Sequence, residues 1–71
     1  MLDRLRRRYR ARIPTRVIMA DYDDKEGDLY LRFSEAERTE GEPSDDGLVI
    51  FHRDRKKNAL VAVEILKLAE L

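Results

Sequence analysis

The stretch Asp21–Phe33, DYDDKEGDLYLRF, decides the fold of this chain. Acidic residues crowd around Gly27, and a strictly alternating apolar run follows, which is the period of a strand with one buried face. Gly27 can adopt a positive φ in a tight turn. Because the preceding residues are rich in β-branched side chains, we predict a hairpin of two strands, 16–23 and 28–34.

The same pattern recurs further along the chain. The spacing Asp-x-Lys-x-Gly that begins at Asp23 returns as Asp-x-Lys-x-Asn from Asp54, and asparagine also tolerates a positive φ. This predicts a second hairpin with strands 47–54 and 58–66. The recurrence is consistent with an internal duplication, but such a spacing is also what short turns of this length tend to use, and we favour that explanation.

The N-terminal segment differs sharply in charge from the rest. Residues 1–16 contain seven arginines against one aspartate, a net +6, whereas the remaining residues have a net −6, so that the whole chain is neutral. Apolar residues at helical spacing before Pro14 predict a short helix over about 3–11. We therefore divide the chain into a basic arm, 1–14, and one small β domain, 15–71.

We expect a mainly β (α+β) protein, a four-stranded antiparallel meander of two hairpins with a short N-terminal helix. The polar segment SEAERTEGEPSDD, which begins at Ser34, is expected to be a long loop in which Arg38 to Glu40 could pair briefly as an edge strand. The chain is short, it has no cysteine, and it has no apolar run of membrane-spanning length. These features favour a soluble cytoplasmic protein.

The last two predicted strands are apolar on both faces, so one face should need a partner, either a second copy or another protein. We expect the core to contain Leu29, Leu31, Phe33, Val61, Val63 and Ile65. We expect the protein-contact face to contain Tyr30, Val49, Phe51, Leu60 and Ala62.

No pattern in the sequence indicates catalysis. The acidic residues from Asp21 to Asp28 do not match the spacing of a calcium-binding loop, because Lys25 stands at a ligand position and the glycine is displaced. His52 is the sole histidine, and it has no nucleophile and acid at a recognisable spacing. We expect no enzyme activity, no metal and no cofactor. Glu64, inside an apolar strand, either faces solvent, or caps a backbone group or pairs with an arginine across an interface.

The arginine arm supports a second hypothesis. Arginine-rich segments grip phosphates and often order on nucleic acid, and a tyrosine can stack on a base. The alternative is a solvated terminus that neutralises its own acidic body. The candidate residues are Arg4, Arg6, Arg7, Arg8, Arg10 and Arg12. A start at Met19, which would remove the arm, is also open.

Residues 17–67 resemble the short proteins of domain-of-unknown-function family 2283. The resemblance rests on Tyr22-Asp23, on Asp28–Phe33, on Gly47–Ile50 and on Val63–Leu66. The chain departs from the family pattern at Phe51 and His52, where acidic residues are usual, and at Lys57-Asn58 and Ala62. The resemblance implies no established activity. By gene neighbourhood it implies an antitoxin-like or partner-binding role, which agrees with our expectation of a homodimer or a small partner protein.

Overall fold

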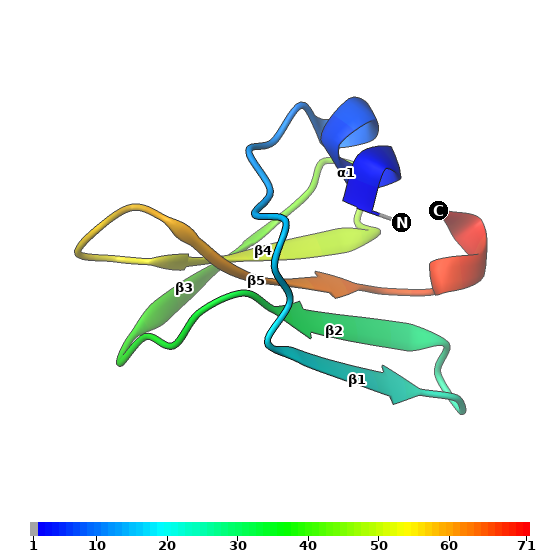
Figure 1. The fold of residues 1–71 in the computed structure, drawn as a ribbon. Coiled ribbons are helices and arrows are strands. Elements are labelled where there is room, and N and C mark those ends of the chain that lie inside the picture. The colour runs from blue at the N-terminus through cyan, green and yellow to red at the C-terminus, as the bar shows by residue number, and fades with distance from the viewer. Residues whose placement is uncertain (1) are drawn as a thin grey trace.

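The computed structural model describes residues 2–71, and Figure 1 shows the arrangement of its elements. The elements are α1 (Leu2–Tyr9), β1 (Met19–Asp23), β2 (Asp28–Arg32), β3 (Thr39–Pro43), β4 (Val49–Asp54), β5 (Leu60–Ile65) and the 3-10 helix η1 (Leu68–Glu70). The prediction of a mainly β protein with an antiparallel sheet and a short N-terminal helix is confirmed.

The described residues form five strands, so the prediction of four was wrong. The additional strand, β3, lies in the segment expected to be a long loop, and it pairs along its whole length with β4. Every residue of β3 is exposed. Because an exposed edge strand buries neither face, its sequence carries no apolar alternation that would reveal it.

The strand order is β1-β2-β5-β4-β3, and all neighbours are antiparallel. The four-stranded meander that we expected would place strand 28–34 beside strand 47–54, which is β4, and this was wrong. Here β2 neighbours β5, with Leu29 opposite Ile65 and Leu31 opposite Val63. The most apolar strand, β5, thereby takes the centre of the sheet, where both of its edges and most of its side chains are covered.

The two predicted hairpin turns have the same local design. Gly27 has φ 74° and its N–H donates to the Asp23 carbonyl at 2.8 Å, while Asn58 has φ 52° and its N–H donates to the Asp54 carbonyl at 2.8 Å. In each turn the carboxylate of the first residue also accepts a backbone N–H from the lysine two positions later, Lys25 or Lys56. The residue spacing that recurs in the sequence therefore corresponds to two turns of the same conformation.

One face of the sheet, the core face, lies under α1 and η1 (Figure 1). Leu5 of α1 is fully buried, and Ile13 follows it into the same cluster. The buried cluster contains Leu5, Ile13, Leu31, Phe33, Val49, Phe51, Leu60, Val63 and Ile65. The boundary at residue 14 thus marks a change in charge, whereas the apolar side chains of the arm belong to the common core.

The pairing of β4 with β5 shifts by one residue next to His52, since His52 faces Ala62 but Arg53 faces Leu60. The extra residue, Val61, returns Leu60 to the core face. Our assignment of Leu60 to the opposite face assumed uninterrupted alternation and was wrong for this reason.

The residue directly after α1, Arg10, has a positive φ of 52°, and the chain turns back across the sheet from there. Arg6 holds this return in place, because its guanidinium donates to the Ile13 carbonyl from Nη2 at 2.8 Å and from Nε at 3.2 Å. The short helix is therefore supported by tertiary contacts, as a helix of two turns requires.

Candidate functional site

Asp46, in the turn between β3 and β4, joins α1 to the sheet. Its carboxylate accepts hydrogen bonds from Tyr9 Oη at 2.9 Å, from Ser44 Oγ at 2.6 Å and from the Leu48 N–H at 3.0 Å. Arg8 forms an ion pair with the same carboxylate at 3.1 Å. Four donors therefore converge on one side chain that our sequence reasoning did not single out.

These bonds shift two pKa values. The hydrogen bonds from Ser44 and from the Leu48 backbone, followed by those from Tyr9 and the charge of Arg8, lower the pKa of Asp46 from 3.8 to about 2. Burial, followed by the hydrogen bond to Asp46, raises the pKa of Tyr9. The arrangement is thus most favourable when Asp46 is charged and Tyr9 is protonated.

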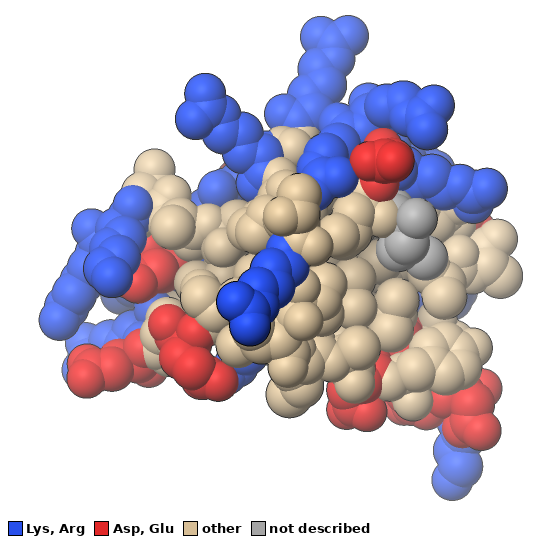
Figure 2. Space-filling model, in the orientation of Figure 1, with Lys and Arg blue, Asp and Glu red and all other residues tan. Residues whose placement is uncertain are grey.

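The six arginines proposed for nucleic acid have two different roles. Arg6 and Arg8 make intramolecular contacts: Arg6 donates to the Ile13 carbonyl, and Arg8 forms an ion pair with Asp46. No ion pair is recorded for the other four among residues 2–71, and their side chains are exposed. These are Arg4, Arg7, Arg10 and Arg12. Figure 2 shows basic side chains gathered over α1 and the segment after it.

The opposite side of the sheet, the open face, is not the bare apolar surface that we expected. Tyr30, Arg32, His52 and Glu64 lie on it, each half-buried. Arg32 donates to the Tyr30 hydroxyl at 3.1 Å, and His52 Nε2 lies 3.3 Å from Glu64 Oε1. The bond to Tyr30, followed by the charge of that residue and then of Glu35, raises the pKa of Arg32.

Glu64 therefore lies beside His52 of the neighbouring strand, and not beside an arginine across an interface. The Tyr30 and His52 rings are steeply inclined to each other, with an interplanar angle of 61° and ring centroids 6.0 Å apart. Ala62, on the row between Arg32 and His52, is fully buried among these larger side chains. The amphipathic side chains of the open face thus cover its small apolar residue themselves.

The predicted protein-contact residues separate into two groups. Val49, Phe51 and Leu60 lie in the buried core with Leu31 and Val63, so placing them on a separate contact face was wrong. The pairing register explains this, because Val49 and Phe51 stand opposite Ile65 and Val63 and so share their face. Tyr30 and Ala62 do lie on the open face.

The exposed large apolar side chains lie instead along β1 and the residues leading into it. Val17, Ile18, Met19 and Tyr22 are 37%, 47%, 44% and 54% exposed. Every residue of β1 is exposed, and β1 is an edge strand. Apolar residues scattered singly need no explanation, but here four lie within six positions, Met19 and Tyr22 on the edge strand β1 and Val17 and Ile18 directly before it.

The free backbone groups of β1 can be identified from the pairing. The Phe33 N–H donates to the Val61 carbonyl, so the odd-numbered residues of β2 bond to β5 and the even-numbered ones bond to β1. Their partners on β1 are Met19, Asp21 and Asp23. Ala20 and Tyr22 therefore direct their N–H and C=O groups away from the sheet.

The acidic turn after β1 has a structural role. Asp23 Oδ1 accepts the N–H groups of Lys25 and Glu26, which shapes the turn. Among residues 2–71 no group of three or more His, Cys, Asp or Glu side chains is placed to hold a metal ion. Asp28 accepts the Lys67 N–H at 3.1 Å and so ties the turn to the C-terminal segment.

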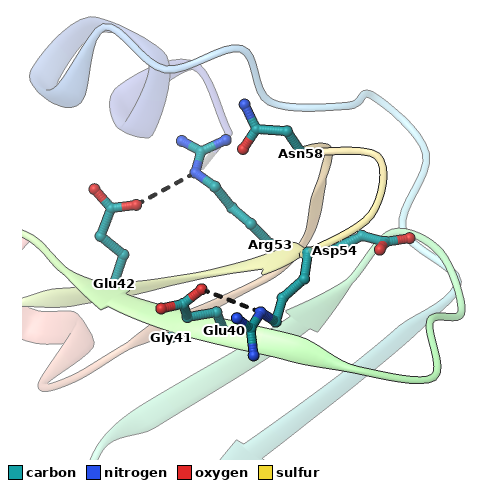
Figure 3. A pocket seen from close by; sticks show the side chains of 7 residues that line it. Glu40, Gly41, Glu42, Arg53, Asp54 and Asn58 are labelled. Carbon is teal, nitrogen blue, oxygen red and sulfur yellow. Dashed lines mark ion pairs between the residues drawn. The ribbon is translucent and has the colours of Figure 1, made fainter.

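A shallow pocket of about 410 Å³ lies between β3 and the end of β4 (Figure 3). Its charged side chains pair with each other, Arg53 with Glu42 at 3.5 Å and Arg55 with Glu40 at 3.7 Å. Ser44 bonds to Asp46 and to the Val49 N–H, so its hydroxyl is committed to the turn.

Comparisons of the chain with protein-family models, with curated proteins and with solved structures found no match. No helix among the described residues is long and apolar enough to cross a membrane.

Proposed function

We propose that this chain is a small non-catalytic protein-binding domain whose contact surface is β1 with the residues leading into it. One observation carries the proposal. Exposed large apolar side chains gather within six positions: Met19 and Tyr22 belong to β1, an edge strand paired on one side only, and Val17 and Ile18 come directly before it. Covering such an edge stabilises a complex through both apolar burial and backbone hydrogen bonds.

Two further points support binding rather than catalysis. The polar groups of the open face are engaged with one another, as are the charged groups of the pocket beside β3. The resemblance of residues 17–67 to family 2283 is consistent with a partner-binding, antitoxin-like role. The partner on this proposal is either another small protein or a second copy of the chain.

The test is the solution mass of the chain purified from its native cells, with any material that copurifies. A stoichiometric complex is expected, and the double variant Ile18→Lys, Tyr22→Lys should lose it. Ala59→Lys is the matched control, because Ala59 is exposed in the turn between β4 and β5, and β5 lies two strands away from β1. If the double variant retains the complex while folded, the proposed surface is wrong.

Nucleic-acid binding is the second candidate, and a specific observation favours it. Arg4, Arg7, Arg10 and Arg12 are exposed near one another in sequence and have no recorded ion pair among residues 2–71. Free arginines of this kind can contact phosphates. The proposal makes them, and not Arg6 or Arg8, the phosphate-binding residues.

Deleting the arm is an unsuitable test, because Leu5 and Ile13 belong to the core. The triple variant Arg4→Ala, Arg7→Ala, Arg12→Ala keeps both. If the chain binds duplex DNA, this variant should bind more weakly. The slope of log K against log[salt] should also become shallower by about 0.9 for each phosphate contact that is lost. A gel shift that is the same for the variant and the native chain would exclude this role.

A further inference from the structure

We infer that the β1 edge accepts an extended strand in which basic and apolar residues alternate, supplied by a different protein. This inference rests on the proposed function and names the chemistry of its partner. It combines three observations about β1, namely its free backbone groups, the faces on which its side chains lie and its charge.

The outer edge of β1 has backbone groups that are free to accept another strand. Ala20 and Tyr22 are the two inner residues of β1 whose N–H and C=O groups do not bond to β2, as the register shows. The outer edge of β3, in contrast, ends in Pro43, and its glutamates pair with arginines of β4 and of the turn beyond it. Proline and charged pairs discourage strand addition, so β1 is the more receptive edge.

The side chains of β1 alternate between two chemistries. Tyr22 and Ala20 stand opposite Leu29 and Leu31 and therefore lie on the core-face side of the sheet. Asp21 and Asp23 lie on the open-face side. An added strand would place its side chains beside these two rows, so its own residues should alternate between apolar and basic.

The charge of this region selects the partner. Residues 21–28 contain five acidic side chains and one lysine. Figure 2 shows acidic side chains gathered at the turn that follows β1, on the opposite side of the molecule from the basic residues of α1. A basic strand is attracted to this edge, and an acidic one is repelled.

The same charges argue against a second copy as the occupant. If two β1 strands paired antiparallel and in full register, Asp21 of one copy would stand opposite Asp21 of the other. Like charges directly opposite each other destabilise a strand pair. Met19 would face Asp23, which gives no compensating attraction. The edge is therefore suited to a chain with the opposite charge.

The probe is a blocked octapeptide of four Lys-Val repeats, titrated into the full-length chain and followed by calorimetry. In antiparallel addition the residues that bond to Ala20 and Tyr22 have their side chains on the core-face side, so they are the valines. A peptide N-methylated at every valine should bind about 10- to 100-fold more weakly, because about two hydrogen bonds are lost. The peptide N-methylated at every lysine has the same charge and composition and should bind as the parent does.

A variant of the protein gives the reciprocal test. In Ala20→Pro the lost N–H faces solvent, and proline is tolerated at such edge positions, so the chain should remain folded by circular dichroism. The Ala20→Pro variant should no longer bind the Lys-Val octapeptide. An octapeptide of Glu-Val repeats should not bind to the native chain.

The inference is overturned if both methylated peptides bind as tightly as the parent, or if folded Ala20→Pro binds it unchanged. It is also overturned if the free chain proves to be a dimer that buries Ala20 and Tyr22, since a second copy would then occupy the edge. If the parent peptide fails to bind while the Ile18→Lys, Tyr22→Lys variant loses the native partner, the strand chemistry alone is wrong. If that variant keeps its partner, the proposed function fails.

Discussion

The Tyr9 hydroxyl donates a hydrogen bond of 2.9 Å to Asp46 Oδ2, and so joins the end of α1 to the turn between β3 and β4. The Tyr9 ring also packs edge-on against Phe51 of the core, with centroids 5.5 Å apart. One residue thus anchors the helix both to a charged turn and to the buried cluster. The basic helix is therefore an integral part of the fold.

The first prediction concerns acid stability. The pKa of Asp46 is lower in the folded chain, about 2, than its ordinary value of 3.8. The carboxylate therefore stabilises the fold fully above pH of about 4, and this contribution is lost as the pH falls toward about 2. Asp46→Asn should remove that part of the pH dependence. The measurement is the urea midpoint from pH 6 to pH 2, and equal declines for both proteins would contradict the prediction.

Tyr9 gives a prediction at the other end of the pH scale. Its pKa is raised by burial and by the bond to Asp46, so its contribution is present at neutral pH and is lost as the pH rises through its folded pKa, above 10. Tyr9→Phe should therefore lower stability at pH 7 and flatten the loss of stability above pH of about 10. Thermal unfolding at pH 7 and above pH 10 tests this, and an unchanged alkaline slope would disagree.

The next prediction concerns the apolar side of α1, which packs on the core. Leu5→Ala removes a fully buried side chain and should lower the free energy of unfolding by about 2–5 kcal/mol. Arg4→Ala, next to it but exposed, should change it by less than about 0.5 kcal/mol. Urea denaturation measures both. If the two variants are equally stable, the helix does not cover the core in solution.

A chain that begins at Met19 should be less stable for the same reason. It would lack Leu5 and Ile13 and would leave Val49, Phe51 and Ile65 uncovered. We expect such a chain to lose its cooperative thermal transition. A sharp thermal transition at the same temperature as that of the full-length chain would show that residues 1–18 are dispensable for folding.

The hairpin turns allow a matched pair of substitutions. Gly27 has positive φ and open space around it, so Gly27→Ala should cost about 1–2 kcal/mol for conformation alone. Asn58→Gly, at the equivalent place in the second turn, should change stability by less than about 1 kcal/mol. Chemical denaturation of the two variants decides this. A cost for Asn58→Gly that exceeds that of Gly27→Ala would be inconsistent with a shared turn design.

The sequence was informative where structure depends on local patterns. The alternation after Gly27 and the repeat at Asn58 predicted both hairpins, and the spacing of Leu2, Leu5 and Tyr9 predicted the helix. Strand 39–43 was missed because all of its residues are exposed, so its sequence shows no apolar alternation, and it is held by backbone pairing with β4.

The strand order and the contact face could not be obtained in this way. Which strand lies beside β2 depends on side-chain fit between segments distant in sequence, and the register shift beside Val61 moves Leu60 to the other face. Asp46 was overlooked, although Ser44, Asp46 and Gly47 together are typical of a hairpin turn with a side-chain cap. That combination would have been the signal to follow.

Amide hydrogen exchange at Ala20 and Tyr22 tests the central claim, that the edge of β1 is free to accept a partner strand. In the free chain both amides should exchange quickly while that of Asp21, bonded to β2, is protected. On addition of the Lys-Val octapeptide, Ala20 and Tyr22 should become protected. Exchange at these two amides that is already slow in the isolated chain, or that does not change when the peptide binds, would contradict the account.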